Sequence, residues 1–329
     1  MKKVSIVIPL FNTEKWIGAM IESILNQSYK LWELIIVDDG SSDNSLGVAQ
    51  SYSDDRITVL KRERLPKGAP TCRNIGIEHS SGDYVVLIDS DDILLPDAIA
   101  DRVSMMESHP EADFGIAGAK AFKQGESIEE ALKKDRYVYG DFKGDPLSSL
   151  LKSRYPFIVC TNIYRKSSLL KYGITWDENV KAFQDFNFNF SSLNKGLKYV
   201  VEEDLKVDYL YRVNHSTTNI THDFLSEEKF SSGLYLIEKT INALEKRSDS
   251  KQRKNEFLGF VLNYYLRLVK AYDTDKEKRM LNFCENYYNP YVLFRMRLLS
   301  SLSKLIPTFK YKMDVLRLMV LFFFGIKIN

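Results

Sequence analysis

The chain has 329 residues, of which 44% are hydrophobic, 12% aromatic and 27% charged. This composition is that of a packed globular protein with one large or two smaller domains, and it excludes a disordered or fibrous chain. A formal net charge of +2 gives no sign of a nucleic-acid partner, and three scattered cysteines exclude a disulfide framework and structural zinc. We therefore expect reduced thiols in a cytoplasmic protein.

The near-neutral total hides two regions of opposite charge. Residues 1–110 carry 17 acidic and 11 basic side chains, whereas residues 291–329 carry seven basic residues and one acidic residue. The N-terminal apolar stretch lacks a small-residue cleavage site, and no apolar run approaches the roughly 18 residues that a spanning helix needs. We expect neither a secretion signal nor a transmembrane segment.

The first 120 residues alternate short β-rich runs with helical patterns, which is typical of stacked βα units and a mainly parallel sheet. The expected strands are at 4–8, 34–37, 57–60 and 84–88, and the clearest helices at about 13–26 and 71–79. Acidic residues follow the second and fourth strands. Because an open α/β sheet places its ligands outside the carboxyl ends of its strands, these residues predict a metal or nucleotide site there.

The second part of the chain has a mixed pattern and then a helical one. Expected strands lie at 114–122, 157–164 and 205–213, and a helix at 184–194 is ended by Lys195-Gly196. Beyond about residue 223 the pattern is almost wholly helical. The sequence therefore predicts an α/β domain over 1–222, made of the halves 1–110 and 111–222, and a helical C-terminal region over 223–329.

Asp89-Ser90-Asp91 presents two carboxylates directly after the fourth strand. Hard cations such as Mg²⁺ and Mn²⁺ prefer oxygen ligands, and Mg²⁺ commonly takes one or two carboxylates and fills its shell with water and phosphate oxygens. Acidic residues also favour helix N-termini, so the tripeptide alone is more simply explained as an acidic loop.

Four motifs occur in a fixed order: IVIPLFN at 6–12, LIIVDDGSSD at 34–43, CRNIGI at 72–77 and GDYVVLIDSDD at 82–92. Together, over residues 3–215, they resemble the inverting family 2 glycosyltransferases of the GT-A fold, which use nucleotide-activated sugars. The likeness is greatest to bacterial enzymes that assemble or decorate cell-surface polysaccharides. The resemblance implies a Rossmann-like nucleotide-diphospho-sugar transferase fold, with a nucleotide-binding half at 1–110 and an acceptor half at 111–222.

The resemblance also implies a set of residues for the uridine nucleotide. Pro9 and Phe11 match positions that contact uracil, and Asp39, rather than Asp38, matches the carboxylate that hydrogen-bonds the base. These residue types fit, because a carboxylate accepts from the uracil N3–H and an aromatic ring stacks on its face. For Phe11 the alternative is a place in the core.

Further residues match positions beside the diphosphate, the sugar and the metal. Arg73 matches an arginine near the diphosphate, where its guanidinium suits phosphate oxygens; the alternative is a surface ion pair on a helix. In the family the first Asp of the DxD motif contacts nucleotide or sugar and the second binds metal. Asp89 and Ser90 are therefore expected at the nucleotide-sugar, and Asp91 at Mn²⁺ or Mg²⁺.

An inverting transfer needs a base, because a sugar hydroxyl is a poor nucleophile until its proton is removed. The family supplies an Asp at the start of a helix, commonly as Glu-Asp. Here Gln184-Asp185 stands at the matching place, so Asp185 is the predicted base. Asp185 could also cap that helix, a role compatible with catalysis.

The chain departs from the family pattern in two loops. Leu65-Pro66-Lys67-Gly68 replaces an Asn-x-Gly pattern that contacts the nucleotide, so Lys67 is a candidate substitute. His222, and less so His215, stands where some relatives place a histidine near the diphosphate or metal, although a lone histidine is more often a surface or core residue. The Gln-x-x-Arg-Trp motif of processive synthases is absent, which favours transfer of one or a few sugars.

The basic tail over 291–329 interleaves Arg and Lys with Leu, Met, Ile and Phe. Such a segment can lie on an anionic membrane, here the inner face of the cytoplasmic membrane, or pack on the catalytic domain or a second subunit.

The expected function is metal-assisted transfer of a hexosyl group from a nucleotide-sugar to a hydroxyl of a surface glycan or lipid-linked acceptor, and the resemblance implies a UDP-sugar as the donor. One alternative is a sugar nucleotidyltransferase, which usually has a Gly-rich loop where this chain has Pro9-Leu10-Phe11-Asn12. The other is a non-catalytic nucleotide-sugar-binding protein of the same fold.

Overall fold

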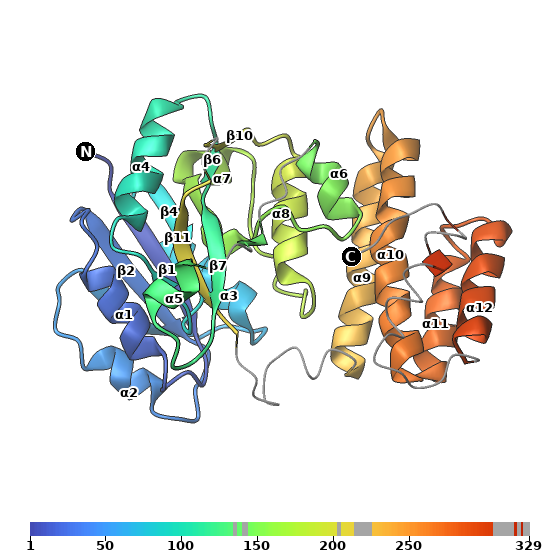
Figure 1. Cartoon of the computed structure of the whole chain (residues 1–329), viewed down its shortest axis with the longest axis horizontal. Coiled ribbons are helices and arrows are strands. Elements are labelled where there is room, and N and C mark those ends of the chain that lie inside the picture. The colour runs from blue at the N-terminus through green and yellow to red at the C-terminus, as the bar shows by residue number, and fades with distance from the viewer. Residues whose placement is uncertain are drawn as a thin grey trace. The chain divides into compact units, whose positions relative to one another are not determined.

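The computed structural model describes residues 1–133, 137–139, 144–202, 205–213, 226–304, 319–320 and 324. The chain divides into two compact units (Figure 1). The first contains Met1–Asp141, Phe157–Asn179 and Phe183–Asn219, and the second contains Phe142–Pro156, Val180–Ala182 and Ile220–Asn329. The sequence predicted one boundary, at residue 222, whereas the segments 142–156 and 180–182 also belong to the helical unit. A short segment carries no sequence signal for the unit on which it packs.

A seven-stranded sheet forms the centre of the first unit in the described residues, with strand order β10-β6-β9-β4-β1-β2-β3 (Figure 1). Strands β3, β2, β1 and β4 are parallel, and β9 runs antiparallel to both β4 and β6. The predicted mainly parallel sheet is thus confirmed. The strands are β1 Val4–Leu10, β2 Trp32–Asp38, β3 Ile57–Lys61, β4 Tyr84–Leu87, β6 Phe114–Ile116, β9 Asn162–Arg165 and β10 Tyr199–Val201.

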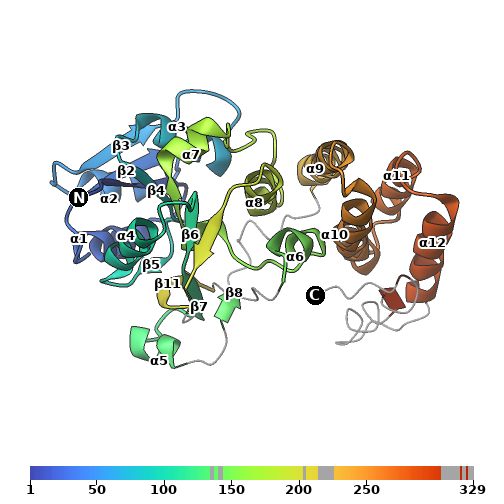
Figure 2. The same ribbon diagram turned by 90° about the horizontal axis from the view of Figure 1, so that it is seen from above.

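Helices cover both faces of this sheet, as the view along it shows (Figure 2). Helices α1 (Ile17–Leu25) and α4 (Ala98–Ser108) pack their apolar residues on one face, and α3 (Ala69–His79) packs on the other. A Cβ at Gly76 of α3 would lie 2.2 Å from Cγ1 of Val7, so only glycine allows α3 to approach β1 this closely. This contact explains the glycine in the third motif and fixes the helix that carries Arg73.

A smaller sheet, with strand order β5-β11-β7-β8 in the described residues, lies in the same unit. Arg102 of α4 donates to both carboxylate oxygens of Asp208 on β11, at 2.7 Å each, and to the carbonyl oxygens of Cys160 and Asn162. Arg102 and Asp208 are fully buried, so this pair joins the small sheet to the central one. The strands are β5 Ile93–Leu94, β7 Gly118–Phe122, β8 Tyr137–Tyr139 and β11 Val207–Arg212.

Two expected strands are shorter or divided in the structure. The run 114–122 breaks at Ala117, because β6 belongs to the central sheet and β7 to the small one. The run 157–164 begins with a 3₁₀ turn, η1 (Val159–Thr161), before β9. The remaining helices of the first unit are α2 Ser45–Gln50, α5 Ile128–Leu132, α7 Lys166–Lys171 and α8 Gln184–Asn194.

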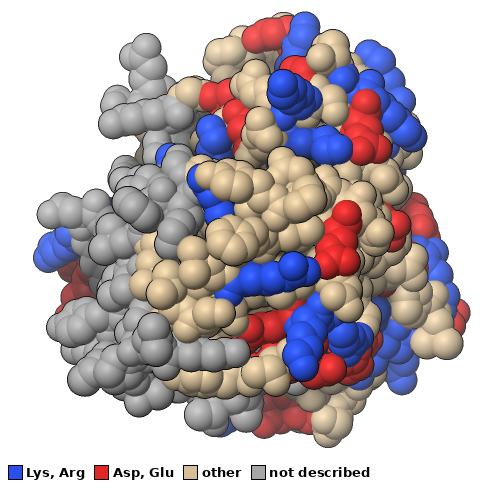
Figure 3. Space-filling view, turned by 90° about the vertical axis from the view of Figure 1, so that its right-hand side faces the viewer, with Lys and Arg blue, Asp and Glu red and all other residues tan. Residues whose placement is uncertain are grey.

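The second unit is helical in its described residues. It contains α6 Pro146–Leu151, α9 Glu227–Glu245, α10 Ser250–Ala271, α11 Thr274–Cys284 and α12 Pro290–Lys304. Figure 3 views the molecule from the side of α11 and α12, where uncharged side chains lie next to basic ones. Tyr291 and Phe294 of α12 are 60% and 61% exposed there. Among the described helices, none combines the length and apolar character needed to cross a membrane.

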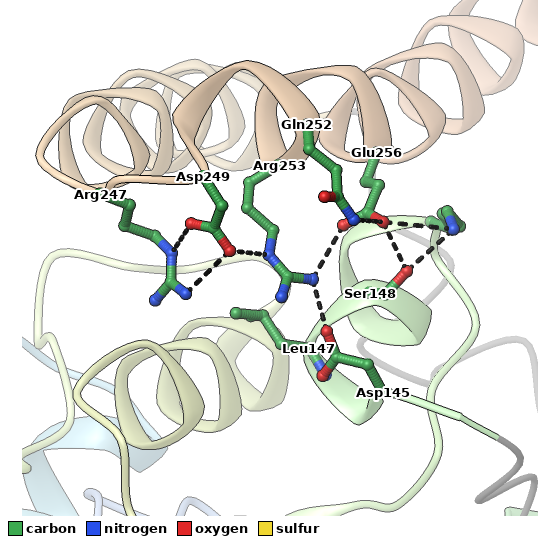
Figure 4. Close-up of polar contacts among 9 residues, drawn as sticks. Asp145, Leu147, Ser148, Arg247, Asp249, Gln252, Arg253 and Glu256 are labelled. Atoms are coloured by element: carbon green, nitrogen blue, oxygen red, sulfur yellow. Dashed lines mark hydrogen bonds and ion pairs between the residues drawn. The ribbon is translucent and has the colours of Figure 1, made fainter.

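A polar cluster holds α6 against α10 (Figure 4). Arg253 of α10 donates to Asp145, Asp249 and Glu256, and Ser148 of α6 donates to Glu256 at 2.8 Å. Asp145 also caps α6, since its carboxylate accepts the backbone N–H of Leu147 at 3.0 Å. The segment 144–156 is therefore tied to α10 by the Arg253–Asp145 ion pair and the hydrogen bond from Ser148 to Glu256.

Candidate active site

The loops that follow β1, β2 and β4 meet at one edge of the central sheet. Pro9 pairs with Val37 in the ladder between β1 and β2, and the backbone N–H of Asp39 donates to the carbonyl oxygen of Leu10 at 2.8 Å. Ser90, which is buried, accepts a hydrogen bond at 3.0 Å from the hydroxyl of Thr13. The structure thus brings the residues that the sequence proposed for the nucleotide to the carboxyl ends of adjacent strands.

The two acids after β2 have different surroundings. The carboxylate of Asp38 accepts the backbone N–H groups of Gly40, at 3.1 Å, and Ser41, at 3.2 Å, and so holds its own loop. Gly40 has φ +82°, in the region that favours glycine. The carboxylate of Asp39 instead accepts from Nε of Arg62 at 2.5 Å. Asp39 also accepts the backbone N–H of Gly68 at 3.2 Å, so Asp38 holds its own loop and Asp39 holds the segment that follows β3.

Phe11 lies at the surface and not in the core. Its side chain is 39% exposed, so the core alternative is wrong for this residue. Nζ of Lys67 lies 3.9 Å from the centre of the ring. The loop that departs from the family pattern therefore does reach the expected uracil position.

Arg73 is buried beneath this edge, so the alternative of a surface ion pair is wrong. Its guanidinium pairs with Asp89 and lies 4.4 Å from the centre of the Trp176 ring. Burial acts to lower the pKa of Arg73, but the negative charges of Asp89 and Asp185 outweigh it and raise this pKa. Nε of Arg73 is buried and has no hydrogen-bond partner among the residues that the structure describes.

Trp176 connects Arg73 to the helix of the predicted base. Asn74 holds its backbone, donating to the carbonyl oxygen of Trp176 at 2.9 Å and accepting its N–H at 3.0 Å. The indole stacks on Phe188 of α8, with ring centres 4.5 Å apart. Trp176 is not among the residues expected from the sequence, where its place in the segment before the expected catalytic helix is the available signal.

Asp185 stands in the first turn of α8 and is partly buried. Phe183 occupies the N-cap position and no side chain caps the helix, so the capping alternative is wrong for Asp185. Burial raises the pKa of Asp185 to about 6, Arg73 acts to lower it, and Asp89 adds to the rise. A carboxylate with this pKa is ionised near neutral pH and still accepts a proton readily.

Asp91 and Asp92, which follow β4, have different surroundings. Asp92 is fully buried and accepts hydrogen bonds from the Tyr209 hydroxyl and from the backbone N–H of Arg212, the latter at 2.6 Å. Burial, followed by the charge of Asp89, raises the pKa of Asp91 to about 6. No other described residue donates a hydrogen bond to the Asp91 carboxylate. Asp92 therefore anchors the loop, and Asp91 keeps its oxygens available.

Arg212 at the end of β11 supports this loop. Its Nε donates to the carbonyl oxygen of Asp91 at 2.5 Å, and its guanidinium lies 4.3 Å from the ring centres of both Trp16 and Phe122. Arg212 is not among the residues expected from the sequence, because its place beside Asp91 depends on the pairing of β11 with β5 and β7.

The described residues contain no group of three or more His, Cys, Asp or Glu side chains arranged to hold a metal. His215 and His222 lie outside the described residues. The predicted metal ligand Asp91 and the neighbouring Asp89 therefore stand as an oxygen-donor pair at the end of β4.

Residues 5–173 match the family model of Glycosyl transferase family 2, and this match covers more than half of the chain. The chain therefore belongs to glycosyltransferase family 2, as its motifs predict.

The chain is also similar to individual proteins that are named as glycosyltransferases. The chain is 27% identical to a poly(ribitol-phosphate) beta-glucosyltransferase of Bacillus spizizenii over 79% of its own length, and it spans about 40% of that relative. It is 17% identical to Staphylococcus aureus TarS 1-349, solved in complex with UDP-GlcNAc, with a TM-score of 0.69 over 98% of this chain and 92% of that one. A mannosyltransferase from Pyrobaculum calidifontis, solved with GDP-Man and Mn²⁺, has a TM-score of 0.55, with 15% identity over 99% and 86%. The predicted GT-A fold is confirmed by these structures.

Proposed function

We propose that the chain transfers a sugar from a UDP-sugar to a hydroxyl of a surface glycan or lipid-linked acceptor, with inversion at the anomeric carbon. The observation that carries this proposal is Arg73, buried between the charges of Asp89 and Asp185 at the edge where the nucleotide motifs meet. Family membership and a structural relative that holds UDP-GlcNAc support the donor class.

The uridine part of the donor is assigned to the loops after β1 and β2. The exposed ring of Phe11 offers a stacking surface beside Pro9, and the Asp39 carboxylate accepts the uracil N3–H. Lys67, whose Nζ lies over the Phe11 ring, is placed to contact the nucleotide in place of the Asn-x-Gly pattern.

The diphosphate and the donor sugar are assigned to Arg73, Asp89 and Ser90. Arg73 offers guanidinium N–H groups to diphosphate oxygens. Asp89 and the backbone at Ser90 then position the sugar. Ser90 itself is engaged with Thr13, so we assign it a supporting contact.

The oxygen donors at the end of β4 fit a divalent cation. Asp91 would hold Mn²⁺ or Mg²⁺, with Asp89 beside it, because a hard cation needs few protein carboxylates when phosphate oxygens and water complete its shell. Such an ion offsets charge on the departing diphosphate. A contribution from His222, named by the sequence, stays a prediction.

The chemical step is assigned to Asp185. Its carboxylate takes the proton of the acceptor hydroxyl as that oxygen bonds to the anomeric carbon and the bond from this carbon to the UDP oxygen breaks. A pKa of about 6 supports this role, because the group is ionised at neutral pH. The positive charge of Arg73 acts to lower this pKa and so favours the ionised carboxylate.

We assign catalysis to the first unit, with nucleotide binding in residues 1–110 and acceptor binding in those residues of 111–222 that belong to this unit. The helical region is assigned a peripheral contact with the inner face of the cytoplasmic membrane. The support is α12, which carries the exposed Tyr291 and Phe294 together with Arg295 and Arg297. Cosedimentation with anionic and neutral vesicles tests this; equal binding, or self-association of the chain instead, would contradict it.

The experiment for the main proposal measures thermal unfolding with UDP, UDP-glucose and UDP-GlcNAc, each with and without Mn²⁺, because a ligand of the folded state raises the melting temperature. UDP release in the presence of teichoic-acid or lipid-linked acceptors then tests transfer. No shift with any uridine nucleotide would refute the proposal. Pyrophosphate release from UTP and a sugar 1-phosphate would favour a nucleotidyltransferase, and UDP binding without turnover a non-catalytic protein.

A further inference from the structure

Trp176 is almost fully buried, with 3% of its surface exposed, in the segment that leads to α8. Its indole contacts two groups that belong to different parts of the site. Cζ of Arg73 lies 4.4 Å from the ring centre, and the ring of Phe188 stacks on the indole at 4.5 Å with an interplanar angle of 24°. One side chain therefore contacts both the arginine assigned to the diphosphate and the helix that carries Asp185.

Asn74, the residue after Arg73 on α3, fixes the backbone of Trp176. Its amide pairs with both the carbonyl oxygen and the N–H of Trp176, at 2.9 and 3.0 Å, as a neighbouring strand would. The same amide donates to Glu178 at 2.8 Å. Asn74 is buried, so removing its side chain would leave buried backbone groups without a partner. Trp176 is therefore fixed to the helix that carries Arg73.

The first turn of α8 depends on tertiary contacts for its position. The N-cap residue is Phe183, and no side chain of the described residues caps the helix. The first N–H groups of a helix have no partner within it, and a capping side chain would otherwise fix them. Phe188 follows Asp185 by three residues, and residues at this spacing are neighbours on a helix surface. The stack of Trp176 on Phe188 therefore fixes the part of α8 next to the predicted base.

The distance between Arg73 and Asp185 matters for an inverting transfer. The departing diphosphate and the incoming hydroxyl lie on opposite sides of the anomeric carbon, so the groups that hold them must be a fixed distance apart. A displacement of about 1 Å can reduce the rate about 100-fold. We propose that Trp176, held by Asn74, is a positioning residue that sets the distance between Arg73 and Asp185. This inference rests on the proposed function.

Transfer kinetics and UDP binding, both measured on the full chain, test the proposal. Trp176→Leu should lower kcat for UDP release about 10- to 100-fold, because no indole sets this distance. The Kd for UDP in the presence of Mn²⁺, from calorimetric titration, should change less than about threefold, because Arg73 keeps its pairing with Asp89. Trp176→Phe keeps a ring that can stack on Phe188 and should recover most of kcat.

Asn74→Ala tests the same contact from the other side. It keeps the indole but releases the backbone of Trp176, so it should also lower kcat with little effect on the Kd for UDP. Because both changes act on one contact between α3 and α8, the double variant should lose no more than the larger of the two single losses. Asn74→Ala decides the question if Trp176→Leu fails to fold.

Trp32→Leu is the matched control. Trp32 is 2% exposed, and Cζ of Arg56 lies 3.7 Å from its ring centre, but it starts β2 and so lies at the opposite end of this strand from Asp38. Its loss should lower the melting temperature about as much as Trp176→Leu does and leave kcat unchanged.

Two outcomes would overturn the inference. If Trp176→Leu, or Asn74→Ala in its place, lowers the melting temperature but keeps the wild-type kcat, these residues only support the fold, and the proposed sugar transfer stands. A wild type that releases no UDP from any UDP-sugar overturns the proposed function and this inference together.

Discussion

Replacing Asp185 with Asn should make the protein more stable at neutral pH. The pKa of Asp185 is raised from 3.8 to about 6, chiefly by burial, so ionising this carboxyl is harder in the folded state than in the unfolded state. A shift of about two units corresponds to about 3 kcal/mol. Because the pKa of Asp185 is higher in the folded state than in the unfolded state, the free energy of unfolding of the wild type falls by this amount as the pH rises from about 4 to about 6. It stays lower at higher pH.

Asn keeps the size of the side chain and has no charge to lose. We therefore expect the melting temperature of Asp185→Asn to equal that of the wild type near pH 4 and to exceed it by several degrees at pH 7.5. The same variant should lose transfer by a factor of about 10² to 10⁴, because an amide cannot take the acceptor proton. The wild-type transfer rate should fall as the pH drops below about 6.

Thermal unfolding at a series of pH values, together with UDP release, measures both effects. Glu111→Gln, at an exposed acid, is the control and should change neither quantity. A difference in melting temperature that is the same at every pH would show that burial does not raise this pKa. A variant with a near-normal rate would show that Asp185 is not the base.

Three further changes test the site and its scaffold. Asp91→Asn should remove the additional thermal shift that Mn²⁺ gives in the presence of UDP, while UDP alone still binds; an unchanged Mn²⁺ effect would exclude Asp91 as ligand. Gly76→Ala should destabilise the first unit by about 1 to 3 kcal/mol, because the new methyl group would lie 2.2 Å from Val7 Cγ1; a denaturant midpoint equal to that of the wild type would contradict this packing. Arg253→Leu should destabilise the helical unit by about 1 to 3 kcal/mol, because Asp145 and Glu256 lose a shared partner; proteolysis at 142–156 as slow as in the wild type would argue against it.

The motifs could place much of the site, because each follows a strand whose apolar run was visible. Asp39 and Asp89 are such residues, and the parallel sheet brings the ends of their strands together, whereas Arg73 lies within α3, which packs on β1 through Gly76. The distinction between Asp38 and Asp39 depended on the resemblance, and the structure gives its reason: the first acid satisfies its own turn.

Other contributors could not be found from the sequence, because tertiary pairing alone brings them to the site. Arg212 stands about 120 residues from Asp91 and reaches it through the order of strands in the small sheet. Arg62 follows β3 with no motif around it, and only the β2–β3 register aims it at Asp39. A sequence motif gives the spacing of residues along the chain, whereas the contacts of Arg212 and Arg62 depend on which strands are neighbours in the sheets.

The attachment of α6 to the C-terminal helices limits how such a protein can be shortened or recombined. The helical unit is not a tail that one cut removes, because Leu147, Leu150 and Leu151 of α6 are buried within it. A gene fragment that ends near residue 222 would encode α6 without α10, and so would expose these leucines and leave Asp145 without Arg253. Evolutionary exchange of the helical unit would thus require breakpoints on both sides of α6 and of residues 180–182, besides the one before α9.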